Sequence, residues 1–244
     1  MIPSQFLALA LVLLLTGCAI RSGQTADDEV QVQPPPVQQL AIPGWRHQTF
    51  PGKRASQYRV ATENGVPVIV VDANASASML KRELRIEPAA LAVANFSWRA
   101  SQLVRDADMA QMHSDDSPVR VVLIFEGDRA VFSAKDAMLS ELARALTGEE
   151  LPYATLMYVW SNKRKPETVI VNPRTSRIRK IVVESGPSNL DQWVSYKRNI
   201  RADFEAAFGE PPGALLGVAL MTDTDNTQAK ARAWYGPVTL EAAR

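Results

Sequence analysis

Residues 58–72 read YRVATENGVPVIVVD, and they contain the clearest local folding signal of the chain. Asn64-Gly65 stands between two runs rich in β-branched and aromatic residues, over residues 58–62 and 66–72. Asn-Gly suits a tight hairpin turn, because both central residues of a type I′ turn need positive φ. The stretch therefore predicts a β-hairpin of two antiparallel strands.

Further short runs of β-forming residues follow the hairpin. The other expected strands cover residues 84–86, 91–99, 119–126, 154–160, 168–171, 177–184, 215–223 and 234–241. Two helices are expected between them, over residues 135–146 and about 190–208, where apolar residues recur at steps of three and four. Many short strands with turn signals and little helix are typical of a β-sandwich.

An apolar stripe is the reason to expect the second helix. Trp193, Tyr196, Ile200, Phe204 and Phe208 follow one another at steps of three and four. Such a stripe falls on one face of a helix. It is more typical of core packing than of a cofactor site.

The N-terminal segment predicts a lipid-anchored protein. Residues 6–16 read FLALALVLLLT, an apolar run of 11 residues. A bilayer span needs about 20 residues, whereas this length suits a signal-peptide core. Leu15-Thr16-Gly17-Cys18 follows and resembles the bacterial lipobox, in which a peptidase cuts before the cysteine and a diacylglyceryl thioether anchors the product. An ordinary secretory signal followed by an unmodified cysteine is the alternative.

This interpretation sets the expected organisation and location. Residues 1–17 would be the signal peptide, residues 18–42 the lipidated Cys18 and a polar, proline-rich tether, and residues 43–244 a single folded domain. The lipid bilayer is then an expected partner, bound through the acyl chains on Cys18, where each buried methylene contributes about 0.8 kcal/mol. Ala19 follows the cysteine, which by resemblance to enterobacterial sorting rules favours the outer membrane, with the domain facing the periplasm.

Composition excludes several function classes. The formal net charge is +1 and no long basic run occurs, so nucleic acid is not an expected partner. Cys18 is the only cysteine, so the chain can form neither an intrachain disulfide nor a site with several thiolates. With two histidines, a catalytic centre built on several imidazoles is excluded.

Asp223, Asp225 and Asn226 form the first candidate site. They supply two carboxylates and an amide directly after an apolar strand. Ca²⁺ takes oxygen ligands at about 2.3–2.6 Å, and a short Asp-x-Asp-Asn loop can wrap around one. Asp and Asn also favour turns, because their side chains bond to nearby backbone groups. A calcium site and a plain turn are therefore both open.

Asp115 and Asp116, with His113 and Arg120, form the second candidate site. The spacing matches no standard zinc motif, and an Asp paired with Arg120 in a bidentate fork is the alternative. No Gly-x-Ser-x-Gly or His-Glu-x-x-His motif occurs. A carboxylate pair for glycoside cleavage stays open, since such residues are often far apart in sequence. Asp115, Asp116 and Glu126 are its candidates.

Aromatic side chains on expected strands are candidates for ligand binding. Trp98, Tyr158 and Trp160 could stack on the flat C–H faces of sugars, with Arg99 and Arg120 as polar partners. Tyr158 and Trp160 point to the same face of their strand, because side chains alternate with a period of two. If that face is the inner one, both rings are core.

The order of several motifs resembles a known bacterial family. Those motifs are Trp98-Arg99, HSDDSPVR at residues 113–120, Tyr158-Val159-Trp160, MTDTDNT at residues 221–227 and Trp234-Tyr235-Gly236. The set is similar to the family called domain of unknown function 3047, over about residues 43–240. The resemblance implies a jelly-roll sandwich of the galactose-binding or carbohydrate-module type. Gln228 departs from the pattern, which usually has Gly there.

Together these features favour a binding protein. We expect a mainly β, jelly-roll-like antiparallel β-sandwich with two α-helices, a non-catalytic module that binds a carbohydrate or another ligand of the envelope. A polysaccharide-acting enzyme with a carboxylate acid/base pair is the first alternative. A structural protein that docks another envelope protein is the second.

Overall fold

The hairpin expected from the Asn-Gly turn is present in the computed structural model of the protein, which describes residues 44–242. β2 (Gln57–Glu63) pairs antiparallel with β3 (Val66–Asn74). Asn64 and Gly65 have φ values of 51° and 79°, as a type I′ turn requires. The expected signal peptide, the lipidated cysteine and the tether lie outside the described residues.

Seven strands form the larger sheet. Their order is β1 (Arg46–Thr49), β4 (Ala77–Ile86), β11 (Leu215–Asp223), β6 (Ser117–Phe125), β7 (Ala154–Ser161), β9 (Ile178–Ser185) and β8 (Val169–Val171). All neighbours in this sheet are antiparallel except β7 and β9, which run parallel. The sheet is therefore mainly antiparallel, as expected, with one parallel pair.

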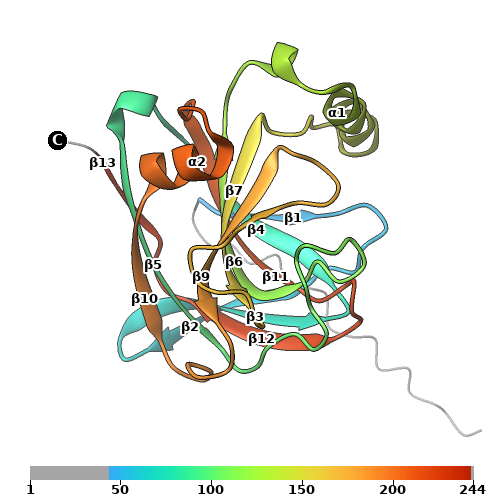
Figure 1. Ribbon diagram of the computed structural model, residues 1–244. Helices are drawn as coiled ribbons and strands as arrows, with labels where there is room; N and C mark the ends of the chain where they lie inside the picture. The colour runs from blue at the N-terminus through green and yellow to red at the C-terminus, as the bar shows by residue number, and fades with distance from the viewer. Residues whose placement is uncertain (1–43, 243–244) are drawn as a thin grey trace, which may run out of the picture. The chain divides into compact units, whose positions relative to one another are not determined.

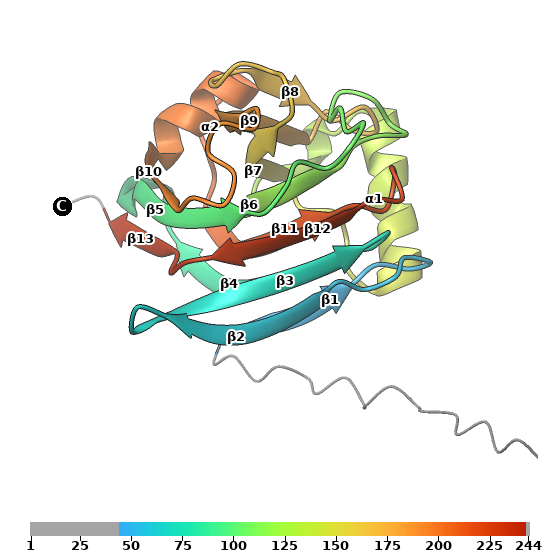
Figure 2. The ribbon, with the colours of Figure 1, turned by 90° about the horizontal axis from the view of Figure 1, so that it is seen from below.

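Six strands form the second sheet. β10 (Val194–Asn199), β5 (Leu91–Ala100), β12 (Lys230–Tyr235), β3 and β2 follow in that order, and β13 (Thr239–Ala242) also pairs with β5. Two short 3-10 turns, η1 (Pro88–Ala90) and η2 (Arg129–Val131), complete the connections. Figures 1 and 2 show the two sheets stacked on each other, which confirms the mainly β, jelly-roll-like sandwich.

The larger sheet is buried on both faces, and β6 shows this best. Every residue of β6 is buried. Val121 and Leu123 point into the main core between the sheets, whereas Val122 and Ile124 belong to a second apolar cluster on the outer face. The alternation follows from the period of two along a strand. This second cluster positions the cleft described below.

Both expected helices exist, but the second is shorter than expected. α1 (Ala134–Thr147) is capped by Ser133, whose hydroxyl accepts from the backbone N–H of Asp136, and it ends at Gly148 with φ of 76°. α2 (Ile200–Phe208) is capped by Asn199 and packs against β5, β9 and β10. The helices stand apart in Figures 1 and 2. Within residues 44–242, no helix has the length and apolar character needed to cross a bilayer.

β1 was not expected from the sequence, and three other segments differ clearly from the expectation. Residues 194–199, expected as helix, form β10, whose side chains alternate between half-buried and exposed and which pairs with β5. The strand expected at residues 84–86 is the end of the longer β4. The strand expected at residues 234–241 is split into β12 and β13, because Pro237 cannot donate a ladder hydrogen bond.

Candidate functional site

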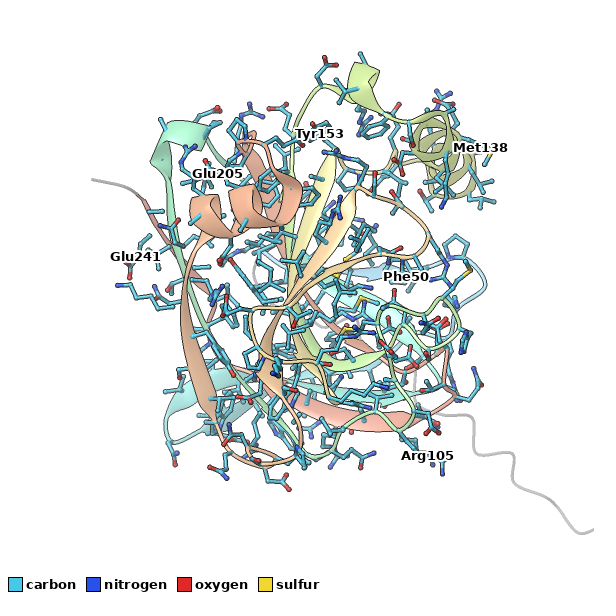
Figure 3. All side chains as sticks on the ribbon, in the orientation of Figure 1. Phe50, Arg105, Met138, Tyr153, Glu205 and Glu241 are labelled. Carbon is cyan, nitrogen blue, oxygen red and sulfur yellow. The ribbon has the colours of Figure 1, made fainter. Side chains whose placement is uncertain are left out.

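A cleft of about 550 Å³ lies on the outer face of the larger sheet, next to α1. Val122 and Ile124 of β6, Met157 of β7 and Met221 of β11 contribute to its floor. The wall opposite comes from α1, including Leu142 and Leu146. Met138 marks α1 in Figure 3, and Phe50, which also lines the cleft, lies below the helix in that view. The walls of the cleft are thus mainly aliphatic.

A connected group of charged side chains, which we call the polar cluster, reaches one end of this cleft, and all its members except Asp116 and Lys180 line the cleft. Its members are Asp115, Asp116, Arg120, Lys180, Asp223, Asp225 and Lys53. Five of the seven are buried. The two candidate sites expected from the sequence are therefore parts of one arrangement.

Arg120 connects two aspartates, Asp115 and Asp223, that lie more than a hundred residues apart in the sequence. Its Nη2 donates to Oδ1 of Asp115 at 3.2 Å and lies 3.0 Å from Oδ2 of Asp223. Its side chain is only 4% exposed. The pairing of an aspartate with Arg120, offered as the alternative to a metal site, is present with both Asp115 and Asp223, but through the single nitrogen Nη2 and not as a bidentate fork.

Lys180 is the second buried cation of the cluster. Its Nζ donates to both carboxylate oxygens of Asp115 at 2.7 Å and to the carbonyl oxygen of Met109 at 3.1 Å. Burial lowers the pKa of Lys180 to about 8, and the neighbouring Arg120 adds to the decrease, while Asp115 acts against it. Asp115 is therefore held between two cations.

Asp116 holds the turn after β11. Its Oδ1 accepts from the backbone N–H and the side-chain amide of Asn226, at 3.2 and 2.9 Å. Its Oδ2 accepts from the backbone N–H and the hydroxyl of Thr227, both at 2.7 Å. Gln228, where the family pattern usually has Gly, adopts a φ of 53° in the same turn. The turn explanation for the Asp-Asn segment is thus supported by its hydrogen bonds.

Asp223 and Arg120 each have one buried polar atom without a hydrogen-bond partner among the described residues. In Asp223 that atom is Oδ1. Burial raises the pKa of Asp223 well above its usual range, Arg120 opposes that shift, and the carboxylates of Asp116 and Asp225 add to it. Asp225 pairs with Lys53. Protonation of Asp223 is therefore favoured more than that of an exposed aspartate.

We expect Asp223→Asn to remove a pH dependence of stability. Because the folded state raises the pKa of Asp223, it binds the proton more tightly than the unfolded chain does. The resulting stabilisation is complete below about pH 4, the unfolded value, and is lost as the pH rises through the folded pKa. The slope is at most about 1.4 kcal/mol per pH unit. Urea unfolding across this range should show the wild-type advantage over Asp223→Asn shrinking as pH increases; parallel curves would contradict the assignment.

Three carboxylates come close enough to share a cation. Asp116, Asp223 and Asp225 each bring one oxygen to within 4.8 Å of the others. Asn226, expected as a ligand, instead donates its side-chain amide to Asp116 and to the carbonyl oxygen of Asp115. Oxygen ligands of this kind suit Ca²⁺. A calcium site therefore stays a prediction, in which the third ligand is Asp116 and not Asn226.

The aromatic candidates lie in the core. Trp98, Tyr158 and Trp160 are all 0% exposed. Trp160 donates its Nε1–H to the carbonyl oxygen of Gly186 at 3.0 Å, and Tyr158 donates its hydroxyl to Oδ2 of Asp203 at 2.8 Å. These three rings therefore do not form an open face on which sugars could stack. The faces of β5 and β7 that carry them point inward, between the two sheets.

Glu126 lies too far from the polar cluster to form a catalytic pair with it. Asp116 immediately precedes β6 and Glu126 immediately follows it, and nine strand residues span roughly 30 Å. Carboxyl groups of glycosidases lie about 5–9.5 Å apart. Glu126 is exposed and accepts from Arg85 at 2.8 Å. The expectation that Asp115 or Asp116 forms a catalytic pair with Glu126 is therefore wrong.

Arg99 belongs to the other sheet. It donates to Oε1 of Glu63 at 2.7 Å, and its guanidinium lies 4.1 Å from the ring centroid of Trp234. Strand alternation places it on the face opposite the buried Trp98. It does not line the cleft.

Three contributors to the polar cluster and its surroundings were not expected from the sequence. Lys53 pairs with Asp225. Lys180 follows Ile178 and Arg179 on β9, and Asn172 donates its side-chain amide to Oδ2 of Asp115 at 3.0 Å. A lysine inside a β-branched run is a weak signal for a buried partner, since edge strands also carry lysine. Nothing local distinguishes Asn172 from an ordinary turn residue.

The fold and the site define a β-sandwich with a cleft on the outer face of one sheet, apolar along its walls and charged at one end. Residues 43–239 match the family described as "Protein of unknown function (DUF3047)", and the chain belongs to this family. The search of curated proteins returned no match.

Solved structures with similar folds share little sequence with this chain. The xyloglucanase domain of NopAA, a type three effector from Sinorhizobium fredii, in complex with cellobiose, is 7% identical with a TM-score of 0.42, over 82% of this chain and 93% of that one. A family 12 xyloglucanase from Bacillus licheniformis in complex with a ligand is 8% identical with a TM-score of 0.36, over 85% and 90%. A structure titled "CBM4 structure and function" is 10% identical with a TM-score of 0.34, over 82% and 86%. At these values the comparison carries no information on what the cleft binds.

Proposed function

We propose that the protein is a lipid-anchored, non-catalytic binding protein of the bacterial envelope, whose cleft binds a ligand that carries carbohydrate. The observation that supports this most is the cleft of about 550 Å³ with apolar walls and a polar cluster at one end. Small-molecule sites typically measure about 300–1,000 Å³ and combine an apolar lining with a few polar groups. The carboxylates at the polar end accept hydrogen bonds, which hydroxyl groups donate.

The location is part of the same proposal and rests on the sequence. An apolar run of signal-peptide length is followed directly by the lipobox-like segment that ends at Cys18. Acylation there would tether the domain to the membrane, and Ala19 favours the outer membrane, with the cleft exposed to the periplasm. Polysaccharides and glycolipids of the envelope are the ligands within reach.

Binding can be tested with the mature chain lacking its lipidated cysteine, residues 19–244. We expect it to bind at least one envelope saccharide on a glycan array. Asp225→Asn should weaken that binding about tenfold or more, because a hydrogen bond to a charged acceptor is lost. Asp106→Asn, in an exposed loop, is the matched control and should bind as the wild type does. No binding across a broad array would refute the proposal.

A polysaccharide-acting enzyme is the second candidate. Asp223 with its raised pKa lies beside Asp225, which pairs with Lys53. Two carboxyl groups held in different electrostatic environments are what acid/base catalysis uses. Release of reducing ends from a bound polysaccharide by the wild type, absent in Asp223→Asn with folding intact, would favour the enzyme over the binding protein.

A further inference from the structure

Helix α1 is attached to the domain through polar groups. Its two buried residues are Asp136 and Ser140. The carboxylate of Asp136 accepts from the hydroxyl groups of Thr175 and Ser176. A surface helix normally buries its apolar stripe against the body of the protein. α1 buries only polar residues in this way, so its leucines are free to contact a ligand.

Those leucines form a wall of the cleft while staying accessible. Leu142 and Leu146 are 52% and 62% exposed, and both line the cleft. Across from them lie the aliphatic and methionine side chains of the sheet floor. The cleft is therefore apolar on two opposing sides and open between them.

The side chains of these walls favour an alkyl chain over a sugar ring as the group bound between them. Phe50 is the only aromatic residue among those that line the cleft. Sugar rings bind best by stacking on aromatic faces, and one phenyl ring offers little such surface. Leucine and methionine side chains adapt their shape to a flexible chain. An alkyl chain fits these walls better than a second sugar ring does.

The charge at the polar end limits the head group of such a ligand. The polar cluster combines four aspartates with three cationic side chains, and Arg174, which also lines the cleft, adds a fourth cation, so the charges balance when all are ionised. Because these charges are balanced by one another, none is left unpaired for an ionic head group, whereas hydroxyl groups can donate to the carboxylates.

We propose that the cleft holds a single alkyl chain between α1 and the sheet, with a neutral, hydroxyl-rich head at the polar cluster. The ligand class is then a neutral amphiphile of the glycolipid type. This inference rests on the proposed function, because it assigns the ligand of the same cleft.

The test uses n-alkyl β-D-glucosides from hexyl to nonyl, below their micelle-forming concentrations, with isothermal titration calorimetry on residues 19–244. Both apolar clusters lie within residues 44–242, so this chain contains the complete core. Affinity should rise roughly fourfold for each added methylene, the value for full transfer out of water. Leu142→Asp should reduce the affinity of the nonyl compound at least tenfold.

Met138→Asp is the matched control. Met138 lies one turn before Leu142 on α1 and is 64% exposed, but it does not line the cleft. It should leave binding unchanged. If both variants weaken binding equally, the chain does not lie in this cleft and the inference is overturned.

The remaining outcomes separate the inference from the proposed function. An affinity that is the same from hexyl to nonyl glucoside would overturn the alkyl-chain site while leaving a saccharide site in place. Equal binding of nonyl glucoside and an anionic alkyl sulfate would overturn the neutral head. No binding of any glucoside, together with a silent glycan array, would overturn both proposals.

Discussion

Arg120→Leu is expected to lower the free energy of unfolding by about 3–5 kcal/mol, the range for removing one partner of a buried ion pair. Arg120 is buried between Asp115 and Asp223, and its Nη2 also donates to the carbonyl oxygen of Asp115 at 2.7 Å. Lys180 still compensates Asp115 in the variant. Asp223 loses the only ion pair that it forms within residues 44–242, so it either keeps an uncompensated buried charge or takes up a proton. Urea unfolding at neutral pH measures the loss.

Arg85→Leu is the control for this prediction. Arg85 pairs with Glu126 and Glu87 on the surface, with half of its side chain exposed. Solvent screens such pairs, so their removal should change stability little. Adding Asp223→Asn to Arg120→Leu should restore part of the loss, because the uncompensated charge is then gone. A loss no larger than that of Arg85→Leu would mean that water reaches the polar cluster.

Turn chemistry made part of the fold predictable. Asn64-Gly65 determines a hairpin by itself, because the positive φ that the turn needs is a local property. α1 was predictable for the same reason, with a serine cap before its periodic stretch and a glycine after it. Signals of this kind depend on a few neighbouring residues and on no other part of the chain.

The segment before α2 shows where local patterns fail. The stripe from Trp193 to Phe208 has helical spacing, yet residues 194–199 also alternate as a strand does. Pairing with β5 decided between the two patterns, with Tyr196 opposite Phe96. A partner more than ninety residues away in sequence is not visible in a local period, and β-structure depends strongly on such partners.

The candidate site was predicted in fragments for a related reason. Asp115 and Asp116 precede β6, and Asp223 ends β11, so the sequence separates them by about a hundred residues. Sheet order brings them together, since β11 pairs with β6 and places Asp223 opposite Ser117. The sequence identified the aspartates as candidate site residues. It could not show that they belong to one polar cluster, because this depends on the order of the strands in the sheet. The cleft itself required the position of α1.

Trp160→Ala is expected to lower the free energy of unfolding by about 3–5 kcal/mol, as for other large core aromatic residues. The ring is 0% exposed and belongs to the main core between the two sheets. The variant also leaves the carbonyl oxygen of Gly186 without its indole donor. Alternation along β7 predicts that Tyr158 and Trp160 lie on the same face of the strand. Because that face packs in the core, both rings contribute to stability and do not contact a ligand. Thermal and urea unfolding would measure the effect.

Trp234→Ala provides the comparison, because Trp234 is only partly buried and stacks against Arg99 on the outer face of the other sheet. Its loss should cost clearly less than that of Trp160, while Trp160→Phe, which keeps a buried ring, should lie between the two. Ligand binding by Trp160→Ala should decrease only in proportion to the unfolded fraction, since the indole does not line the cleft. A Trp160→Ala variant that is as stable as the wild type but no longer binds ligand would contradict this assignment. Such a result would mean that Trp160 belongs to the ligand site and that saccharides stack on the aromatic side chains of the strands.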